Sequence, residues 1–247
     1  MKKILIFGGT TEGRELAEWC AANGIAADVS VTTDYGARLL GSGEMLNVFT
    51  GRLDSAEMIT LINAGNYAAV IDATHPYAAE ATANIRDACC RTKSRYYRLI
   101  REECELTGIC VDSFDELITV LNSTDRTILS TLGSKELSVF THINDRKKRV
   151  WFRVLPTVGI ADMCDRYGFD PSHIIAETPP YSVAANIGHI RKSGAEILVT
   201  KECGLKGGYP EKITAAKECG IETVTIKRPA DSGYRFDELT KLLGEGL

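Results

Sequence analysis

The 247-residue sequence lacks several features that would place it in a special class of protein. No apolar run approaches the ~18 residues of a membrane-spanning helix, and the run behind the basic start, Ile4 to Phe7, is too short for a signal-peptide core. The eight cysteines include no Cys-x-x-Cys pair and no Cys/His spacing typical of a metal site. We therefore expect a cytoplasmic protein with reduced thiols, no membrane association and no metal in its chemistry.

An excess of positive charge is lacking as well. The chain has 29 Lys and Arg residues against 33 Asp and Glu residues, which gives a net charge of −4 at pH 7. A surface that follows nucleic-acid phosphates needs a basic excess, so we expect no nucleic-acid partner. The composition, 44% hydrophobic and 25% charged, is typical of a globular protein and suits one large domain or two of about 120 residues each.

Short apolar runs alternate with helical patterns along the first hundred residues. Strands are predicted at 3–7, 27–32, 45–49 and 67–71, and helices at 14–23, 55–63 and 79–90. This alternation predicts a parallel sheet with right-handed crossovers. If the strand order is the usual 3-2-1-4, the loops after the first and fourth strands face each other at the carboxyl edge, where open α/β sheets bind ligands.

The second half of the chain repeats the alternation. Strands are predicted at 127–131, 150–155, 173–176, 196–200 and 221–226, with helices at 183–192 and 210–219. The pattern is interrupted between Arg101 and Asp112. We therefore predict a second α/β domain that begins in this interval.

A glycine-rich segment follows the first predicted strand and reads Gly8-Gly9-Thr10-Thr11-Glu12-Gly13. It departs from Gly-x-Gly-x-x-Gly, but it has the strand before and the helix after that this fingerprint requires. Glycines let the backbone approach a pyrophosphate, and the helix amino terminus offers unpaired N–H groups. A tight turn without a ligand is the alternative, and we favour dinucleotide binding.

An acidic residue about twenty positions after the glycine loop would bind a ribose diol. The sequence offers Thr32, Thr33 and Asp34 there. Asp34 would suit NADH, whereas the threonines with Arg14 or Arg38 nearby would tolerate the extra phosphate of NADPH. Both cofactors therefore remain open.

The fourth predicted strand runs into polar residues, Asp72-Ala73-Thr74-His75-Pro76-Tyr77. Pro76 cannot donate a ladder hydrogen bond and keeps His75 extended, so the strand should end near Ala73 and expose Thr74, His75 and Tyr77. His75 is either an acid that titrates near neutrality or a residue that fixes the turn. Asp72 is expected to cap a neighbouring loop, because a buried carboxylate needs partners.

Basic residues follow two predicted strands of the second half. Lys201-Glu202-Cys203-Gly204 with Lys206 places two ammonium groups in a glycine-rich loop, and Ser134-Lys135 follows another strand. Such loops suit carboxylate or phosphate ligands, with a solvated loop as the alternative. The basic series from Arg91 to Arg101 is expected to be mainly a solvated face.

With these residues assembled, the chain resembles the precorrin-6A reductase and cobalt-precorrin-6A reductase family of the corrin ring pathway to cobalamin. The resemblance extends over the full length. It is carried by the opening Ile4 to Ala17, by Val31-Thr32-Thr33 with Tyr35-Gly36, by Ile71 to Ala78, by Leu132 to Leu137, by Lys201 to Gly204, and by Ala215 to Lys217 with Arg228-Pro229.

The resemblance implies two Rossmann-like domains with the active site in the cleft between them. We assign residues 1–103 to dinucleotide binding and residues 104–247 to the substrate domain. The implied reaction is reduction of one macrocycle double bond of a polycarboxylate tetrapyrrole by NADPH or NADH. Candidate catalytic residues are His75, Tyr77 and Lys201, and candidate substrate-binding residues are Ser134, Lys135, Lys201, Gly204 and Lys206.

We assign the cofactor to the glycine loop of residues 8–13, to residues 32–34 and to residues 72–76. A non-catalytic dinucleotide sensor and an adenosyl-donor transferase are the alternative functions, because both use glycine loops of this kind. The sequence indicates neither an oligomeric state nor the proton donor.

Overall fold

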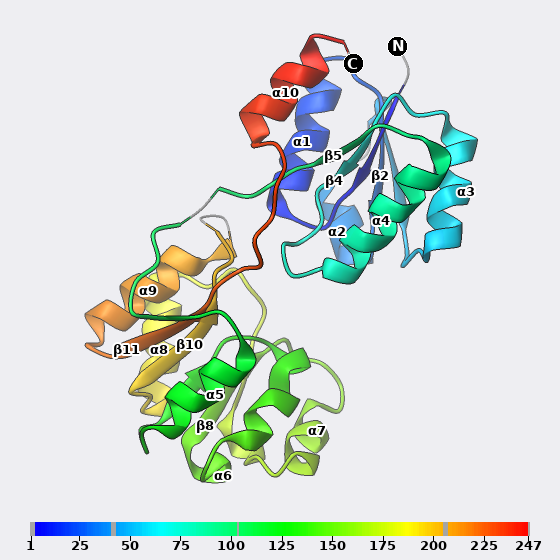
Figure 1. Cartoon of the computed structure of the whole chain (residues 1–247). Helices are drawn as coiled ribbons and strands as arrows, with labels where there is room; N and C mark the ends of the chain where they lie inside the picture. The colour runs from blue at the N-terminus through cyan, green and yellow to red at the C-terminus, as the bar shows by residue number, and fades with distance from the viewer. Residues whose placement is uncertain (1–2, 41–42, 103, 205–206, 247) are drawn as a thin grey trace. The chain divides into compact units, whose positions relative to one another are not determined.

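The computed structural model describes residues 3–40, 43–102, 104–204 and 207–246 (Figure 1). The chain divides into two compact units, one made of Met1–Glu102 with Ala230–Leu247 and the other of Glu103–Pro229. Each unit contains one sheet whose strands pair in parallel. The predicted α/β class with two parallel sheets is confirmed.

The first sheet has the order β3-β2-β1-β4-β5. Its strands are β1 Ile4–Phe7, β2 Ala27–Val31, β3 Leu46–Thr50, β4 Val70–Asp72 and β5 Tyr96–Arg98. The predicted order 3-2-1-4 is confirmed, so β1 and β4 are neighbours at the point where the strand order reverses. Strand β5 was not predicted, because it is three residues long, half-buried at its two tyrosines and not part of an apolar run.

Helices cover both faces of this sheet (Figure 1). They are α1 Thr11–Ala22, α2 Asp34–Leu40, α3 Ser55–Gly65, α4 Ala79–Thr92 and α10 Phe236–Gly244. Ile4 and Ile6 of β1 belong to the core under α1 and α10, while Leu5 and Phe7 belong to the core under α3 and α4. Both faces of β1 are therefore buried, which explains why its sequence shows no polar alternation.

The end of the chain packs on the first unit. Leu239 and Leu243 of α10 are buried in the same core as Leu16 and Ala17 of α1. Just before α10, the Tyr234 N–H donates to the Arg98 carbonyl at 2.8 Å. Residues 104–247 were all predicted to form the second domain, whereas residues 230–247 belong to the first unit, because the apolar stripe of α10 packs on the first sheet.

The second sheet has the order β6-β11-β10-β7-β8-β9. Its strands are β6 Ile109–Val111, β7 Ile128–Ser130, β8 Val150–Val154, β9 Ile174–Ala176, β10 Ile197–Lys201 and β11 Glu222–Ile226. Without β6, this order reproduces that of the first sheet. The strand order therefore reverses between β7 and β10, which places the loops after these two strands side by side.

Helical segments cover the second sheet as well. They are α5 Phe114–Asn122, η1 Ser134–His142, α6 Arg146–Arg149, α7 Ile160–Arg166, η2 Pro171–His173, α8 Val183–Ser193 and α9 Tyr209–Glu218. The predicted helices at 183–192 and 210–219 are confirmed as α8 and α9. These two helices pack together over one face, where Ile190, Ala215 and Ala216 are buried against Leu129 and Leu198 of the sheet.

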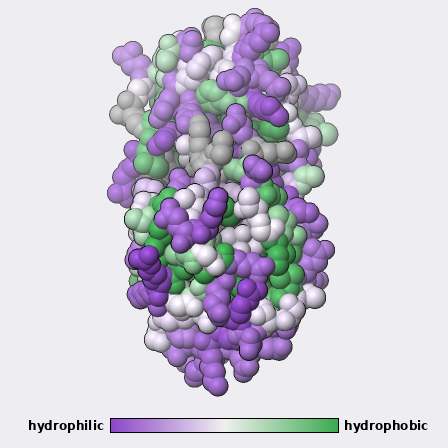
Figure 2. Space-filling view, turned by 90° about the vertical axis from the view of Figure 1, so that its left-hand side faces the viewer, coloured by the Kyte–Doolittle hydropathy of each residue, from purple (hydrophilic) through white to green (hydrophobic). Residues whose placement is uncertain are grey.

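Large apolar side chains lie mainly in these cores. On the face drawn in Figure 2, hydrophobic residues are interspersed with hydrophilic ones. The large hydrophobic residues described as exposed are Leu39, Phe49, Leu155, Val158, Tyr167 and Tyr234. None of the helices in the described part of the chain has the length and apolar character needed to cross a membrane.

Candidate functional site

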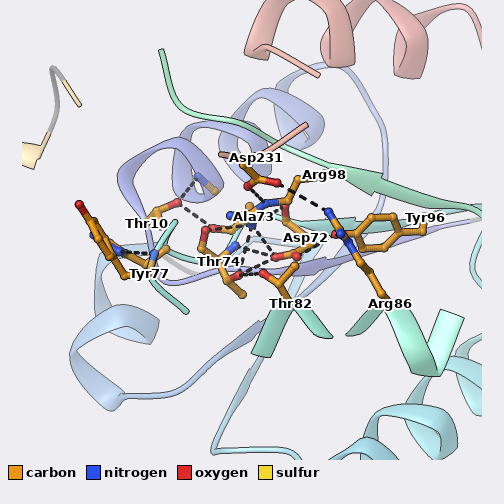
Figure 3. Close-up of polar contacts among 12 residues, drawn as sticks. Thr10, Asp72, Ala73, Thr74, Tyr77, Thr82, Arg86, Tyr96, Arg98 and Asp231 are labelled. Carbon is orange, nitrogen blue, oxygen red and sulfur yellow. Dashed lines mark hydrogen bonds and ion pairs between the residues drawn. The ribbon is translucent and has the colours of Figure 1, made fainter. Parts of the chain in front are cut away.

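The glycine loop and the loop after β4 are joined by one side chain, that of Thr10. Its hydroxyl donates to the Ala73 carbonyl at 2.9 Å and accepts the Gly13 N–H at 3.0 Å, which caps α1 (Figure 3). A Cβ on Gly13 would lie 3.0 Å from the Cβ of Ala73, so glycine permits this close approach. The prediction that the two loops face each other is confirmed.

Gly9 supplies the bend of the glycine loop. Its φ of +113° lies in the region that favours glycine, and a Cβ built there would meet nothing within 4 Å. The preceding Gly8 N–H donates to the Ser30 carbonyl at 2.8 Å, which ties the loop to β2. The backbone at Gly9 therefore has open space beside it, next to the amino terminus of α1, and this arrangement fits an anionic group.

Glu12 is held by a buried ion pair. Its carboxylate accepts from Arg101 at 2.7 Å, and both side chains are largely buried. The pair anchors the first turn of α1 to the segment that follows β5. It also compensates the carboxylate charge, which would otherwise repel a phosphate at the same helix terminus. Through its ion pair with Arg101, Glu12 therefore helps to hold the glycine loop in place.

Asp72 is the last residue of β4, and its side chain is fully buried among hydrogen-bond partners from the protein (Figure 3). Its Oδ1 accepts from Arg98 at 2.8 Å and from the N–H and hydroxyl of Thr74 at 3.0 and 2.7 Å. Its Oδ2 accepts from the Tyr96 hydroxyl at 3.0 Å. The expected capping role is confirmed, and Asp72 shapes the loop of Thr74 and His75 through these contacts.

Arg98 connects this carboxylate to the end of the chain. Only 3% exposed, it donates to the Thr74 carbonyl at 3.0 Å and forms a second ion pair with Asp231 at 2.7 Å. Asp231 lies in the segment that returns to the first unit. The basic series from Arg91 to Arg101 was expected to form mainly a solvated face. This is wrong for Arg98 and Arg101, because both are buried in ion pairs. These ion pairs depend on strand β5, which was not predicted.

Tyr96 completes the network as a neutral phenol. Burial, with the charge of Asp72 second, raises its pKa above the usual range. Its hydroxyl donates to Asp72 and accepts from the Nε of Arg86 at 3.1 Å. The network therefore fixes the ends of β4 and β5 with matched charges and donors.

His75 lies exposed in the loop after β4. Its Nδ1 accepts the Tyr77 N–H at 3.3 Å, its carbonyl accepts the Ala78 N–H at 2.8 Å, and the two rings stack with centroids 5.7 Å apart. In the neutral ring this hydrogen bond places the proton on Nε2. His75 fixes the turn through these contacts and also presents its ring at the carboxyl edge of the sheet. It therefore remains a candidate both for a structural role and for a general acid. Pro76 follows it in the same loop, half-buried.

The residues proposed for the ribose lie at the end of β2. Thr33 accepts the Gly36 N–H at 3.1 Å and so begins α2, while Thr32 and Asp34 are exposed. Asp34 is the first residue of α2. A ribose beside the glycine loop would meet these three residues at the neighbouring strand end, so NADH and NADPH both remain candidates.

In the second unit, an ion pair joins the end of β10 to η1, the helical segment that follows β7. Lys201 donates to Glu136 of η1 at 2.5 Å, and its ammonium lies 5.6 Å from the ring centroid of Phe114. Ser134 and the exposed Lys135 begin η1 after Gly133. Gly204 is buried with a φ of +72°. The predicted substrate residue Lys206 lies outside the described residues.

Comparisons with known proteins agree on one family. The family model described as precorrin-6x reductase CbiJ/CobK matches residues 3–244. A cobalt-precorrin-6A reductase of Methanothermobacter thermautotrophicus is 33% identical, over 92% of this chain and 76% of the relative. One of Priestia megaterium is 32% identical, over 92% and 90%. A precorrin-6A reductase of a Sinorhizobium species is 29% identical, over 93% and 87%.

A solved structure shares the fold. The chain described as CobK precorrin-6A reductase superposes with a TM-score of 0.77 at 22% identity, covering 99% of this chain and 97% of that one. At this identity the likeness concerns the fold, and it supports the arrangement of two parallel sheets described above.

The buried network predicts a large loss of stability for Arg98→Met. The change leaves Asp72 buried without its cation, which costs about 3–5 kcal/mol of unfolding free energy. Arg91→Met is the matched control, because Arg91 forms an exposed pair with Asp87 and its loss should cost less than about 1 kcal/mol. Urea unfolding of both variants measures the difference, and equal small losses would contradict the structural role given to Arg98.

Proposed function

The chain belongs to the precorrin-6x reductase CbiJ/CobK family of oxidoreductases, and from this premise we propose that it reduces a carbon–carbon double bond in the macrocycle of precorrin-6A or its cobalt form, with NADPH or NADH as hydride source. The observation that carries the cofactor assignment is the glycine loop, where Gly9 holds a left-handed φ beside open space at the amino terminus of α1. Its family membership makes the chain an oxidoreductase, so the sensor and transferase alternatives are not retained.

The residues of the first unit fit a dinucleotide. Backbone N–H groups of residues 9–12 would hold the pyrophosphate, since those of Gly8 and Gly13 bond within the protein, and Thr32, Thr33 and Asp34 would lie at the ribose. The loop of residues 72–76 would border the same crevice, since Thr10 ties it to the glycine loop. When bound, the cofactor supplies the hydride. The protein binds it, orients it and sets the charge around it.

The second unit would supply cations for the substrate. Precorrin-type macrocycles carry several carboxylates, and the chain as a whole is negatively charged, so the cations must be concentrated locally. Ser134, Lys135, Lys201 and Gly204 lie at or just after the carboxyl ends of the neighbouring strands β7 and β10. We assign substrate contacts to these residues, together with Lys206.

Turnover tests the proposal directly. Anaerobic incubation of the protein with each macrocycle and each cofactor, followed optically, should show oxidation of NADPH or NADH that requires a macrocycle. Consumption of neither reduced cofactor with either macrocycle would overturn the assignment.

Gly9→Val should weaken dinucleotide binding more than tenfold, because the branched side chain fills the space beside the loop and disfavours its φ. Gly24→Val is the matched control, since Gly24 also has positive φ and open space but lies beyond the other end of α1. Fluorescence titration of the two folded variants with NADPH checks this. Equal affinities would remove the glycine loop from the cofactor site.

His75→Asn separates the two roles of His75. Asparagine can accept the Tyr77 N–H as Nδ1 does now, but it cannot act as an acid near neutrality. If His75 donates the proton, with Tyr77 holding its ring, we expect kcat to fall about a hundredfold while cofactor affinity stays the same. Full turnover by the variant would assign His75 to the turn alone.

Lys201→Ala should raise KM for the macrocycle roughly tenfold to a hundredfold and leave kcat almost unchanged, because a carboxylate contact is present in ground and transition states alike. Glu136→Gln is the control, since it removes the ion pair but keeps the ammonium. If the pair merely holds the two loops, both variants should behave alike. A collapse of NADPH affinity in Lys201→Ala would move this lysine to the cofactor.

A further inference from the structure

Two cations are buried on one face of the second sheet, outside the residues assigned above. Arg153 of β8 is 5% exposed, and Lys212 of α9 is 8% exposed. Neither forms an ion pair with any residue that the structure describes. Burying a charge without a counter-charge is costly, so such residues need an explanation beyond packing.

Arg153 is surrounded by neutral groups. Its NH1 donates to the Asn186 Oδ1 at 2.5 Å and to the His189 Nδ1 at 3.4 Å, and its guanidinium carbon lies 3.9 Å from the centroid of the Tyr181 ring. His189 in turn contacts Glu177 through Nε2 at 2.8 Å. The half-exposed Glu177 carboxylate is thus separated from Arg153 by the imidazole ring, so it orients the cation through His189 without pairing with it.

Lys212 contacts a thiol instead of a carboxylate. Its Nζ lies 3.7 Å from the Sγ of Cys203, which itself donates to the Gly207 carbonyl at 2.8 Å. The Glu211 Oε2 beside it in the sequence is buried and has no hydrogen-bond partner among the described residues. The ammonium therefore has no direct anionic partner within the described part of the chain.

The two cations also act on each other. Burial lowers the pKa of Lys212 and outweighs Cys203 and Glu211, which raise it, while the positive charge of Arg153 lowers it further. Burial likewise lowers the pKa of Arg153 to about 10. Two like charges in a buried setting destabilise the fold, and an anion that joins them would relieve both the repulsion and the lost hydration.

The location suits a ligand. Arg153 is the penultimate residue of β8, Cys203 follows β10, and Lys212 lies in the first turns of α9, so the three lie toward the carboxyl edge of the sheet. The strand order reverses between β7 and β10 at this edge. Ligands of open α/β sheets bind at such points.

We propose that Arg153 and Lys212 form an oxyanion-binding site that takes one carboxylate arm of the macrocycle, with Asn186, His189 and Glu177 positioning the guanidinium. The choice of carboxylate rests on the proposed function. The same cations would recognise a dinucleotide phosphate, and the experiment must distinguish these two sources of the oxyanion.

The test uses uroporphyrin I, a flat macrocycle with acetate and propionate arms, titrated into the full-length protein and followed by its absorbance. Arg153→Met and Lys212→Met should each weaken its binding at least tenfold and leave NADPH affinity unchanged. Lys212→Met should also raise Tm, because it removes a buried charge without a counter-charge. Lys217→Met is the matched control on the exposed side of α9 and should change neither quantity.

Three results would overturn the assignment of this site. A lower Tm of Lys212→Met with unchanged porphyrin affinity would show that the lysine is structural. Loss of NADPH affinity instead would make the oxyanion a phosphate, and absence of porphyrin binding by the unmodified protein would remove the site. If the porphyrin results hold while the protein oxidises no NADPH or NADH with either macrocycle, the binding site stands and the proposed reaction fails.

Discussion

The buried pair of Asp72 and Arg98 is the interaction on which the first unit's site depends. It joins the ends of β4 and β5, and its remaining hydrogen bonds hold the backbone that leads to His75. A lone buried carboxylate here would be costly, so the arginine and the tyrosine hydroxyl are needed for the strand to end in this way. The charges at this strand end are therefore matched within the scaffold, while His75 lies exposed in the loop that follows.

The two units differ in how some of their buried charges are held. In the first unit, Asp72, Glu12 and Asp231 each have an arginine partner, and the glycine loop offers backbone groups to an anion. In the second unit, Glu202 also pairs with Arg228, but Arg153 and Lys212 are held by amide, imidazole and thiol groups. This difference suits a division in which the first unit binds its ligand mainly through backbone and the second through side-chain charge.

Much of the fold could be predicted from the sequence, and the reasons for the failures are local. Apolar runs such as Ile4 to Phe7 identify parallel strands without ambiguity, and Asp72 could be recognised as a capping carboxylate because it ends such a run. The buried role of Arg98 could not be recognised, because its strand is short and lies in a basic series. Its partner Asp231 is also 133 residues away in the sequence. Arg153 did carry a signal, because a charge between Phe152 and Val154 interrupts an apolar strand. Lys212 carried none, since a lysine in an amphipathic helix usually faces solvent.

The return of residues 230–247 to the first unit has a consequence for biosynthesis. The ribosome makes Asp231 and α10 after the second unit, so the nascent first sheet must wait, with the face for α10 uncovered and Arg98 half-neutralised, while the whole second unit is made. Closing the 133-residue separation of Arg98 and Asp231 costs about 1.4 kcal/mol more chain entropy than the 26-residue separation of Arg98 and Asp72. Folding of the intervening unit shortens that effective loop, so the order of events during synthesis favours completion of the second unit before closure of the first.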